Sequence, residues 1–308
     1  MAKILITGGA GYIGSILVPE LLKEGHQVIS IDNSDQNSLS AFSFEPRLNL
    51  VQGDVRDENL ISKHLKDVNF IFPLASITGA PACQKNPELA KSINLEAIKM
   101  ILRIRKKNQG IIFPTTDSGY GVGEKEGGGS DEPVYCDEST PLNPISLYGQ
   151  LKAEAEKAVL EAGNSVSLRL AAVFGVSSRM RWDSLVNNFV WRALKDKYIE
   201  LFEPHFKRSC IHVRDVARAF IHCLNNFEKM KGEVYNLGLK EGNLTKWEVC
   251  QEIKKQIPDF VFVESEKGKD PDRRNYIISY AKIEKTRFKL KYSLEEGIAE
   301  LIKEYQKL

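Results

Sequence analysis

The chain has 308 residues, 42% of them hydrophobic and 27% charged, which is ordinary for one large or two modest globular domains. Its 43 Lys and Arg side chains nearly balance its 41 Asp and Glu, leaving a net charge of +2. A nucleic-acid-binding protein would carry a strong basic excess. No apolar run approaches the ~20 residues of a membrane span. We therefore expect neither nucleic acid nor a membrane as a partner.

The five cysteines are scattered along the chain, and no CxxC or HExxH spacing occurs. The sequence therefore predicts neither a disulfide framework nor a metal site. Reduced thiols favour a cytoplasmic protein. The N-terminus runs directly into glycines, without the apolar segment of a secretion signal.

The first thirty residues predict a nucleotide-binding βαβ unit. An apolar strand at residues 3–7 leads to Gly8-Gly9-Ala10-Gly11-Tyr12-Ile13-Gly14, then to a helix, and then to a strand at 28–31 that ends on Asp32. Such glycines let the backbone approach a pyrophosphate at the helix N-terminus. Asp32 would accept hydrogen bonds from an adenosine ribose and repel a 2′-phosphate, so we expect NAD rather than NADP. The alternative, a merely tight turn, is disfavoured by the complete βαβ context.

Later strand ends carry further candidate contacts, because ligands of open parallel sheets lie beyond the carboxyl ends of the strands. A strand at 48–51 leads to Asp54 and Val55, which are candidates to contact adenine. Asp54 could equally cap the helix that follows. A strand at 68–73 leads to Ala75, a candidate to line the nicotinamide side. A helix at 88–107 contains Asn94, which suits a simple surface position.

The next strand, at 111–113, delivers hydroxyl and carboxylate groups at residues 115–121. They could bond a substrate oxygen or form an ordinary turn. Residues 123–140 form a loop rich in Gly, Ser and acidic residues that reads as exposed.

Tyr148 and Lys152 are four residues apart in a predicted helix at 148–161, so both lie on one face of it. A nearby ammonium favours a phenolate. A tyrosine that normally titrates near ~10 then becomes a usable general base near neutral pH. The spacing is also common on exposed helix faces, and it gains weight from the nucleotide-binding unit at the N-terminus.

After residue 175 the alternation of strands and helices loosens. The predicted elements there are a helix at 189–194, a helix at 216–224 capped by Asp215, a strand at 234–237, a helix at 247–256 capped by Thr245, and a last helix at 294–305. Arginines gathered in this part suit a diphosphate, which they bind bidentately, although surface positions are the alternative.

Together these elements predict an α/β fold, a Rossmann-like doubly wound parallel sheet with a smaller C-terminal substrate-binding domain. We expect residues 1–175 to form the NAD-binding domain, with 209–240 returning to it. Residues 176–208 and 241–308 would then form the substrate domain.

The chain resembles the extended short-chain dehydrogenase/reductase family of nucleotide-sugar epimerases and dehydratases. The similar motifs, in that family's order, lie at residues 7–14, 53–55, 148–152, 168–175 and 208–215. More narrowly, segments 118–125, 179–189 and 270–276 are similar to the bacterial GDP-heptose 4-dehydrogenase group of surface-polysaccharide pathways.

The resemblance implies that Tyr148 is the base, that Lys152 grips the nicotinamide ribose and lowers the tyrosine's pKa, and that Thr116 orients the reacting hydroxyl. The predicted cofactor contacts are Gly8, Gly11, Tyr12, Ile13, Gly14, Asp32, Asn33, Asp54, Val55, Leu74, Ala75, Tyr148 and Lys152. The predicted substrate contacts are Thr116, Asp117, Ser118, Arg179, Arg181, Asn187, Arg208, Arg273 and Arg274. A homodimer is also implied, built from the Tyr148 helix and the helix before the Thr116 strand.

Two departures from the family pattern narrow the reaction. Family dehydratases follow their threonine with Asp-Glu, whereas this chain has Asp117-Ser118, and many members have an asparagine where this chain has Ala172. We therefore expect NAD-dependent oxidation of a sugar hydroxyl, at C4 of a nucleoside-diphosphate hexose or GDP-heptose, by a dehydrogenase or epimerase. The alternatives are a 4,6-dehydratase and a non-catalytic NAD-sensing regulator, which would not need the Tyr148 and Lys152 pair.

Overall fold

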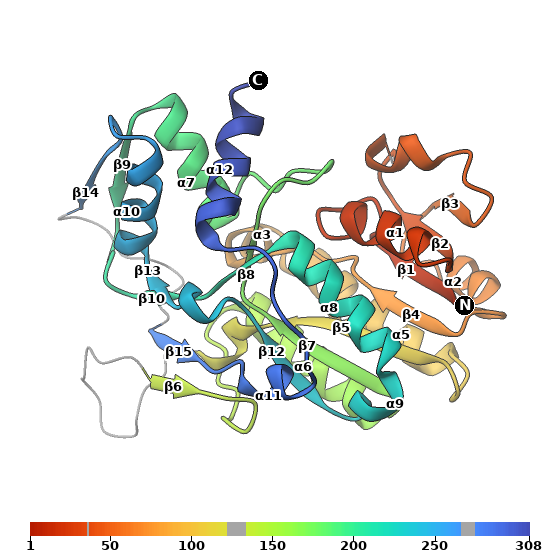
Figure 1. Cartoon of the computed structure of the whole chain (residues 1–308). Coiled ribbons are helices and arrows are strands. Elements are labelled where there is room, and N and C mark those ends of the chain that lie inside the picture. The colour runs from red at the N-terminus through yellow and green to blue at the C-terminus, as the bar shows by residue number, and fades with distance from the viewer. Residues whose placement is uncertain (36, 122–133, 266–274) are drawn as a thin grey trace.

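The computed structural model describes residues 1–35, 37–121, 134–265 and 275–308 of the chain (Figure 1). Its centre is a seven-stranded parallel sheet with the strand order β12-β7-β5-β4-β1-β2-β3. The strands are β1 (Lys3–Thr7), β2 (Gln27–Asp32), β3 (Leu48–Gln52), β4 (Phe70–Pro73), β5 (Gly110–Thr116), β7 (Ser165–Leu170) and β12 (Val234–Leu237). The order reverses between β1 and β4, where open α/β sheets bind ligands. The predicted Rossmann-like, doubly wound sheet is confirmed.

The strands of this sheet bury side chains on both faces. Along β1, Leu5 faces one core while Ile4 and Ile6 face the other, and Ile71 and Phe72 of β4 divide in the same way. Strands covered on both sides read as nearly continuous apolar runs, which is why they could be recognised from the sequence. Burying each such aliphatic side chain stabilises the fold by roughly 1.5–3 kcal/mol.

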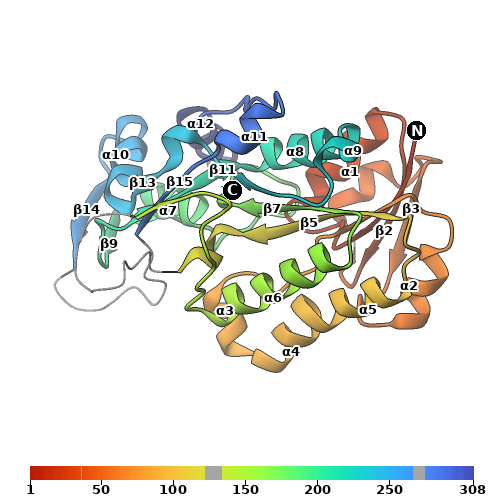
Figure 2. The same cartoon turned by 90° about the horizontal axis from the view of Figure 1, so that it is seen from below.

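Helices cover the two faces of the sheet, as Figure 2 shows. On one face lie α1 (Gly14–Lys23), α8 (Val213–Asn225), α9 (Phe227–Met230) and α11 (Ala281–Lys285). On the other lie α2 (Glu58–Leu65), α3 (Ala80–Lys85), α4 (Pro87–Lys91), α5 (Ala97–Ile104) and α6 (Leu147–Glu161). Short 3-10 helices span Asn37–Phe42, Asp117–Tyr120 and Lys240–Gly242. None of the described helices is both long and apolar enough to cross a membrane.

The predicted helix at 88–107 is wrong in two respects. A π-helical turn, Ser92–Glu96, separates α4 from α5, and the last helical residue is Ile104. Asn94 lies within this π turn, and only 2% of it is exposed. Asn94 is therefore not a surface residue. Such turns occur frequently at functional sites.

A third hydrophobic core lies at the end of the molecule where α7, α10 and α12 gather (Figure 1). Its helices are α7 (Leu185–Lys195), α10 (Lys246–Gln256) and α12 (Leu294–Tyr305). The remaining described strands form four two-stranded sheets. In these sheets β8 (Ala172–Phe174) pairs with β11 (Cys210–His212), and β10 (Lys207–Arg208) pairs with β13 (Leu244–Thr245). Likewise β9 (Tyr198–Leu201) pairs with β14 (Val261–Glu264), and β6 (Val134–Cys136) pairs with β15 (Tyr276–Ile278). Because β12 pairs with β7, the chain returns to the main sheet after β11. The domain boundaries themselves stay a prediction.

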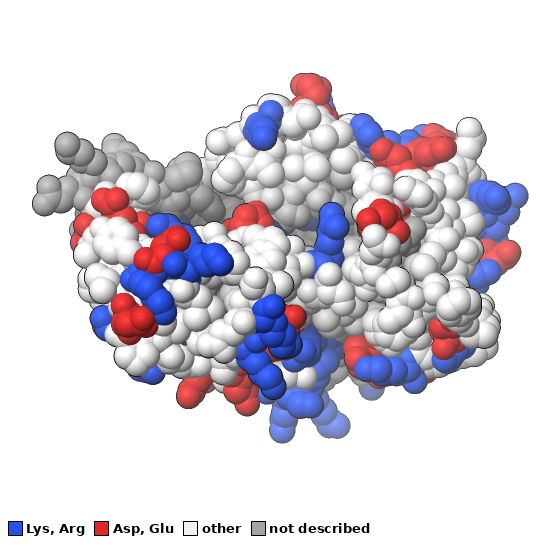
Figure 3. All heavy atoms as spheres, turned by 90° about the horizontal axis from the view of Figure 1, so that it is seen from above, with Lys and Arg blue, Asp and Glu red and all other residues white. Residues whose placement is uncertain are grey.

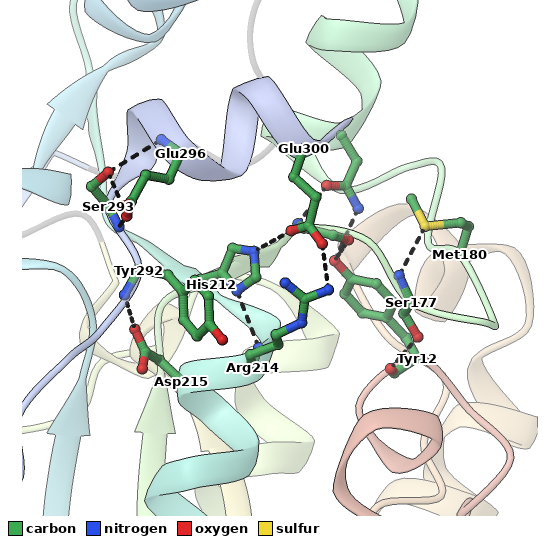
Figure 4. A network of polar contacts seen from close by, with 12 residues as sticks. Tyr12, Ser177, Met180, His212, Arg214, Asp215, Tyr292, Ser293, Glu296 and Glu300 are labelled. Carbon is green, nitrogen blue, oxygen red and sulfur yellow. Dashed lines mark hydrogen bonds and ion pairs between the residues drawn. The ribbon is translucent and has the colours of Figure 1, made fainter. Parts of the chain in front are cut away.

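Helix α8 begins at Val213, three residues before the predicted start. The side chain of His212 caps it by accepting a hydrogen bond from the backbone N–H of Arg214, at 3.2 Å. The prediction that Asp215 caps this helix is wrong. Asp215 is fully buried, and its carboxylate accepts the backbone N–H groups of Lys291 and Tyr292, each at 3.0 Å, just before α12 (Figure 4).

Candidate active site

A cavity of about 660 Å³ opens at the carboxyl ends of the central strands, within the range of ligand-binding pockets. The glycine turn between β1 and α1 lines this cavity. Gly8 has φ +74°, and a Cβ there would lie 2.6 Å from the backbone nitrogen of Ala75. A Cβ on Gly14 would lie 2.4 Å from the carbonyl oxygen of Gly9. A Cβ on Gly11 would approach only the Gly8 carbonyl, at 3.1 Å, so the backbone beside Gly11 is open to a ligand.

Asp32 lies at the end of β2 and lines the cavity. Its carboxylate is fixed by two backbone donors, the N–H of Ala10 and the N–H of Ser34, both at 3.0 Å. The side chain is therefore held at the place where the sequence predicts an adenosine ribose. The neighbouring predicted residues Tyr12, Ile13, Asn33, Val55, Leu74 and Ala75 line the same cavity.

Asp54 also lines the cavity, and its carboxylate forms a two-point ion pair with the Arg56 guanidinium, at 2.9 and 2.5 Å. Hydrogen bonds from Arg56 lower the pKa of Asp54 and keep it ionised. Asp57, not Asp54, caps α2, because its side chain accepts the Leu60 N–H. The capping alternative for Asp54 is wrong.

Tyr148 and Lys152 lie on α6 and both line the cavity. Ser146 caps this helix by accepting the Gly149 N–H at 3.1 Å, so Tyr148 stands in the first helical turn, where the helix dipole favours negative charge. Lys152 is only 4% exposed, and its Nζ lies 4.3 Å from the ring centroid of Phe113. Burial lowers the pKa of Lys152 to about 7, although the carboxylate of Glu156 acts in the opposite direction.

Thr116 is the last residue of β5, Asp117 and Ser118 follow it, and all three line the cavity. The Thr116 hydroxyl accepts the Ser118 N–H at 3.2 Å and shares a hydrogen bond with the Ser118 hydroxyl at 3.0 Å. The buried carboxylate of Asp117 accepts a hydrogen bond from the hydroxyl of Ser209. This cluster therefore adds hydroxyl groups to the cavity that Tyr148 also lines, and it ties the Asp117 carboxylate to the segment between β10 and β11.

Cationic side chains line the part of the cavity formed after residue 175. Arg179, Arg181 and Arg208 were predicted there, and all three line it. Lys246 was missed, because the first residue of a polar helix resembles a surface position. It is only 6% exposed, lines the cavity and donates a hydrogen bond to the Phe202 carbonyl.

Asn187 does not line the cavity, which corrects its predicted contact with the substrate. It is fully buried, and its carboxamide bonds to Gly175, Tyr12 and Arg181 instead. The predicted contacts Arg273 and Arg274, and most of the 123–140 loop, lie outside the described residues.

Asn94, which the sequence analysis placed at the surface, instead forms buried hydrogen bonds beside the cavity. Its carboxamide oxygen accepts the Ser76 hydroxyl at 2.9 Å and the Ile77 N–H at 2.8 Å, while its amide donates to the Ile77 carbonyl at 2.8 Å. These bonds fix the segment after β4, which lines the cavity. The available signal was a polar residue inside an apolar helical pattern.

Comparison with known proteins identifies this arrangement. Residues 4–238 match the NAD dependent epimerase/dehydratase family. The chain belongs to this family. Its members are enzymes that act on sugar nucleotides, and its cofactor is NAD. The open backbone beside Gly11, the fixed carboxylate of Asp32 and the buried Lys152 suit that cofactor.

Individual family members resemble the chain over nearly its whole length. A UDP-glucose 4-epimerase of Lactobacillus helveticus is 29% identical, and the match covers 88% of this chain and 87% of the relative. A dTDP-glucose 4,6-dehydratase of Bacillus anthracis, solved in complex with NAD, is 25% identical with a TM-score of 0.82, covering 100% and 97% of the two chains. A UDP-glucose 4-epimerase of Thermotoga maritima, solved with UDP-glucose, shares the fold with a TM-score of 0.82 at 24% identity over 99% of each chain.

Proposed function

We propose that this enzyme oxidises a secondary hydroxyl, at C4 of a nucleoside-diphosphate hexose or heptose, as a dehydrogenase or an epimerase. One observation carries the proposal. Tyr148, Lys152 and Thr116 line the same cavity as the glycine turn and as Arg179, Arg181 and Arg208. A dinucleotide and a sugar diphosphate would thus meet at the tyrosine.

In this proposal NAD, when bound, supplies the hydride acceptor. Tyr148 takes the proton from the substrate hydroxyl, so that loss of the C–H hydride leaves a ketone. Thr116 holds the reacting oxygen by a hydrogen bond. Lys152 binds the ribose beside the nicotinamide and, when protonated, lowers the pKa of the tyrosine. The arginines bind the diphosphate through paired N–H donors.

The ketone has two possible fates, which use the same side chains. If the sugar turns over and hydride returns to its other face, the enzyme is an epimerase, as the names of its relatives suggest. If the ketone leaves, the enzyme is a dehydrogenase, as segments 118–125, 179–189 and 270–276 suggest by their similarity to GDP-heptose 4-dehydrogenases. The UDP- and dTDP-sugars named for the relatives broaden the candidate substrates beyond the GDP-sugar that these segments favour.

A 4,6-dehydratase is supported less well. Elimination of water needs an acid and a base, and family dehydratases place both directly after the threonine. Here Asp117 accepts a hydrogen bond from Ser209, and Ser118 supplies a hydroxyl in place of the second carboxyl group. The NAD-sensing regulator is disfavoured because it has no use for a tyrosine base with a buried lysine beside it.

The test is to incubate the purified enzyme and NAD with UDP-, dTDP-, CDP- and GDP-hexoses and a GDP-heptose, and to identify the products by NMR. An isomer formed without net NADH indicates an epimerase, whereas a keto sugar formed with NADH indicates a dehydrogenase. Tyr148→Phe should lower kcat by about 10²-fold or more, because proton transfer to a positioned base contributes 10²–10⁴-fold. A 4-keto-6-deoxy product, or full activity in Tyr148→Phe, would contradict the proposal.

Three broader expectations belong with this proposal. The first is a two-domain division at residues 1–175 with 209–240, and 176–208 with 241–308. The second is a homodimer through α5 and α6, which lie side by side on one face of the sheet and are bridged by Lys99 and Glu154 at 2.8 Å (Figure 2). The third is a cytoplasmic location, which suits five buried cysteines that are all unpaired thiols. Light scattering and fractionation test the last two.

A further inference from the structure

The phenol of Tyr12 joins the nucleotide-binding turn to the chain segment that carries the cavity arginines (Figure 4). Tyr12 belongs to the glycine turn and lines the cavity, yet its hydroxyl donates a hydrogen bond to the Gly175 carbonyl, at 2.7 Å and 163 residues away in sequence. The same hydroxyl accepts a hydrogen bond from the amide of Asn187, at 3.1 Å. Burial raises the pKa of the Tyr12 phenol, so it remains a hydroxyl and keeps its donor at neutral pH.

Asn187 continues this connection to Arg181. Its carboxamide oxygen accepts the Gly175 N–H at 3.0 Å, and its amide nitrogen donates to the Tyr12 hydroxyl and to the Arg181 carbonyl, at 2.9 Å. One acceptor and both donors of the side chain are thus used. The orientation of the carboxamide is fixed, because exchanging its oxygen and nitrogen would place N–H against the Gly175 N–H.

A second row of hydrogen bonds runs beside the first. The Ser177 hydroxyl donates to the Tyr12 carbonyl at 2.8 Å and lies 2.6 Å from the Ser15 hydroxyl of α1. Ser177 Oγ also accepts the Arg179 N–H at 3.4 Å. Both cavity arginines of this segment, Arg179 and Arg181, are therefore held by backbone atoms that connect to the turn around Tyr12.

We propose that Tyr12 is a positioning residue through which NAD and the sugar nucleotide bind cooperatively. It connects the turn that would hold the NAD pyrophosphate with the backbone of the two arginines that would hold the substrate diphosphate. This inference rests on the proposed function and adds a residue that acts on the substrate only through Asn187 and the arginines.

The physical reason is that one ordering step serves two ligands. A ligand on the glycine turn fixes the Tyr12 hydroxyl, and through Asn187 it fixes the backbone that aims Arg181. The second ligand then meets arginines whose position is already set, so it loses less conformational freedom on binding. By linkage the effect is reciprocal, and each ligand must tighten the other by the same factor.

The test is a binding cycle measured by calorimetry on the full-length enzyme. UDP, dTDP, CDP and GDP are titrated into protein stripped of cofactor and into protein saturated with NAD, and the ratio of the two Kd values gives the coupling. In the wild type we expect NAD to lower the Kd of the nucleoside diphosphate that binds best by about 10-fold, within the 5- to 150-fold range of allosteric coupling. In Tyr12→Phe that ratio should fall to about 2 or less.

A matched control is Tyr305→Phe. The Tyr305 hydroxyl is also buried, and it has no hydrogen-bond partner among the described residues. The ring of Tyr305 stacks on Trp182, the neighbour of Arg181, at 5.0 Å between centroids. Tyr305→Phe therefore removes a buried phenol hydroxyl but none of the hydrogen bonds of Tyr12. The ratio of the two Kd values should stay at the wild-type value.

Kinetics provide a second readout. Tyr12→Phe should raise KM for the sugar nucleotide about 10-fold while kcat at saturation stays within about threefold, because the variant loses positioning and keeps the base. If Tyr12→Phe does not fold, Ser177→Ala, which removes the second row, should lower the ratio part of the way. A wild-type ratio near 1, or an unchanged ratio in Tyr12→Phe or Ser177→Ala, would overturn the inference and leave the proposed oxidation standing. If none of the four diphosphates binds, both proposals fail.

Discussion

At the scale of a single residue, the buried Lys152 side chain lowers the stability of the folded protein, although the proposed function needs it. The chain places an ammonium group inside the protein, 4% exposed and over the ring of Phe113, where water cannot solvate it. Burial lowers its pKa to about 7, whereas an unfolded lysine titrates near ~10.4. Below pH 7 both states are protonated and the folded state bears the full desolvation cost. Between these two pKa values the unfolded chain holds more protons, so the wild type gains stability as the pH rises.

Lys152→Met should therefore stabilise the protein free of NAD while abolishing activity. The gain should be several kcal/mol at most at pH 6 and should fall below about 1 kcal/mol at pH 10, because this pH is close to the ~10.4 at which the unfolded lysine titrates. Urea unfolding at the two pH values measures it. Lys157→Met on the same helix, where the side chain is 77% exposed, serves as the control and should change little at either pH. Equal effects of Lys152→Met at pH 6 and pH 10 would contradict the argument.

Which site residues the sequence could predict depends on how local their signal is. Gly8, Gly11, Gly14 and Asp32 lie within one short βαβ unit, and Tyr148 with Lys152 lies on one helical turn, so spacing alone groups them. Asn187, Asn94 and Lys246 have no such local signal. Each has a hydrogen-bond partner distant in sequence, Tyr12 for Asn187, Ile77 for Asn94 and Phe202 for Lys246, which only the folded chain brings close. A polar side chain in an amphipathic pattern does not reveal whether it faces water, a ligand or a backbone amide.

At the scale of the secondary-structure element, the sequence predicts the bounds of α12 but not the contacts that attach it to the rest of the fold. Its predicted bounds match Leu294–Tyr305, and the structure shows that Ser293 and Glu296 form a capping box at the start. Its attachment was not predictable. Glu300 accepts a hydrogen bond from His212 at 2.9 Å and pairs with Arg214 at 2.5 Å, which fixes α12 on the start of α8 (Figure 4). The π turn at Asn94 was equally hidden, since one inserted residue barely alters the apolar period.

Glu300→Gln should loosen this attachment in a pH-dependent way. Burial acts to raise the pKa of Glu300, but the hydrogen bond from His212 and the charge of Arg214 outweigh it and lower the pKa. The carboxylate therefore stabilises the fold above its unfolded pKa of ~4.3, and this contribution disappears as the pH falls through the lower folded value. We expect a loss of about 1–3 kcal/mol at pH 7 that becomes smaller as the pH falls below ~4.3.

Chemical unfolding of this variant should be compared with that of Glu304→Gln. Glu304 pairs with Lys307 on the exposed side of the same helix, so its substitution should change stability by less than about 1 kcal/mol. A similar loss in both variants at pH 7 would show that Glu300 acts as an ordinary surface charge.

At the scale of the whole molecule, the cavity is lined by elements from every part of the fold. The glycine turn, β2, β5, α6, the segment after β8, β10 and the start of α10 all contribute residues to it. The surface carries both signs of charge, as the face in Figure 3 shows, in keeping with a net charge of +2. Attraction of an anionic ligand therefore depends on the cations in the cavity, and a ligand that binds only this assembled cavity stabilises the folded state as a whole.

NAD should consequently raise the melting temperature of the whole protein. A ligand at 100 times its Kd stabilises the folded state by about 2.7 kcal/mol, which is several degrees for a chain of this size. NADP at the same concentration should raise it much less, because its 2′-phosphate would meet the Asp32 carboxylate that Ala10 and Ser34 hold in place. Asp32→Asn keeps the shape and removes the charge, so it should narrow the difference between NAD and NADP. Asp35→Asn, on the exposed loop nearby, should leave the difference unchanged. Differential scanning calorimetry measures the melting temperature of the three proteins with each cofactor, and equal stabilisation of the wild type by NAD and NADP would contradict the role given to Asp32.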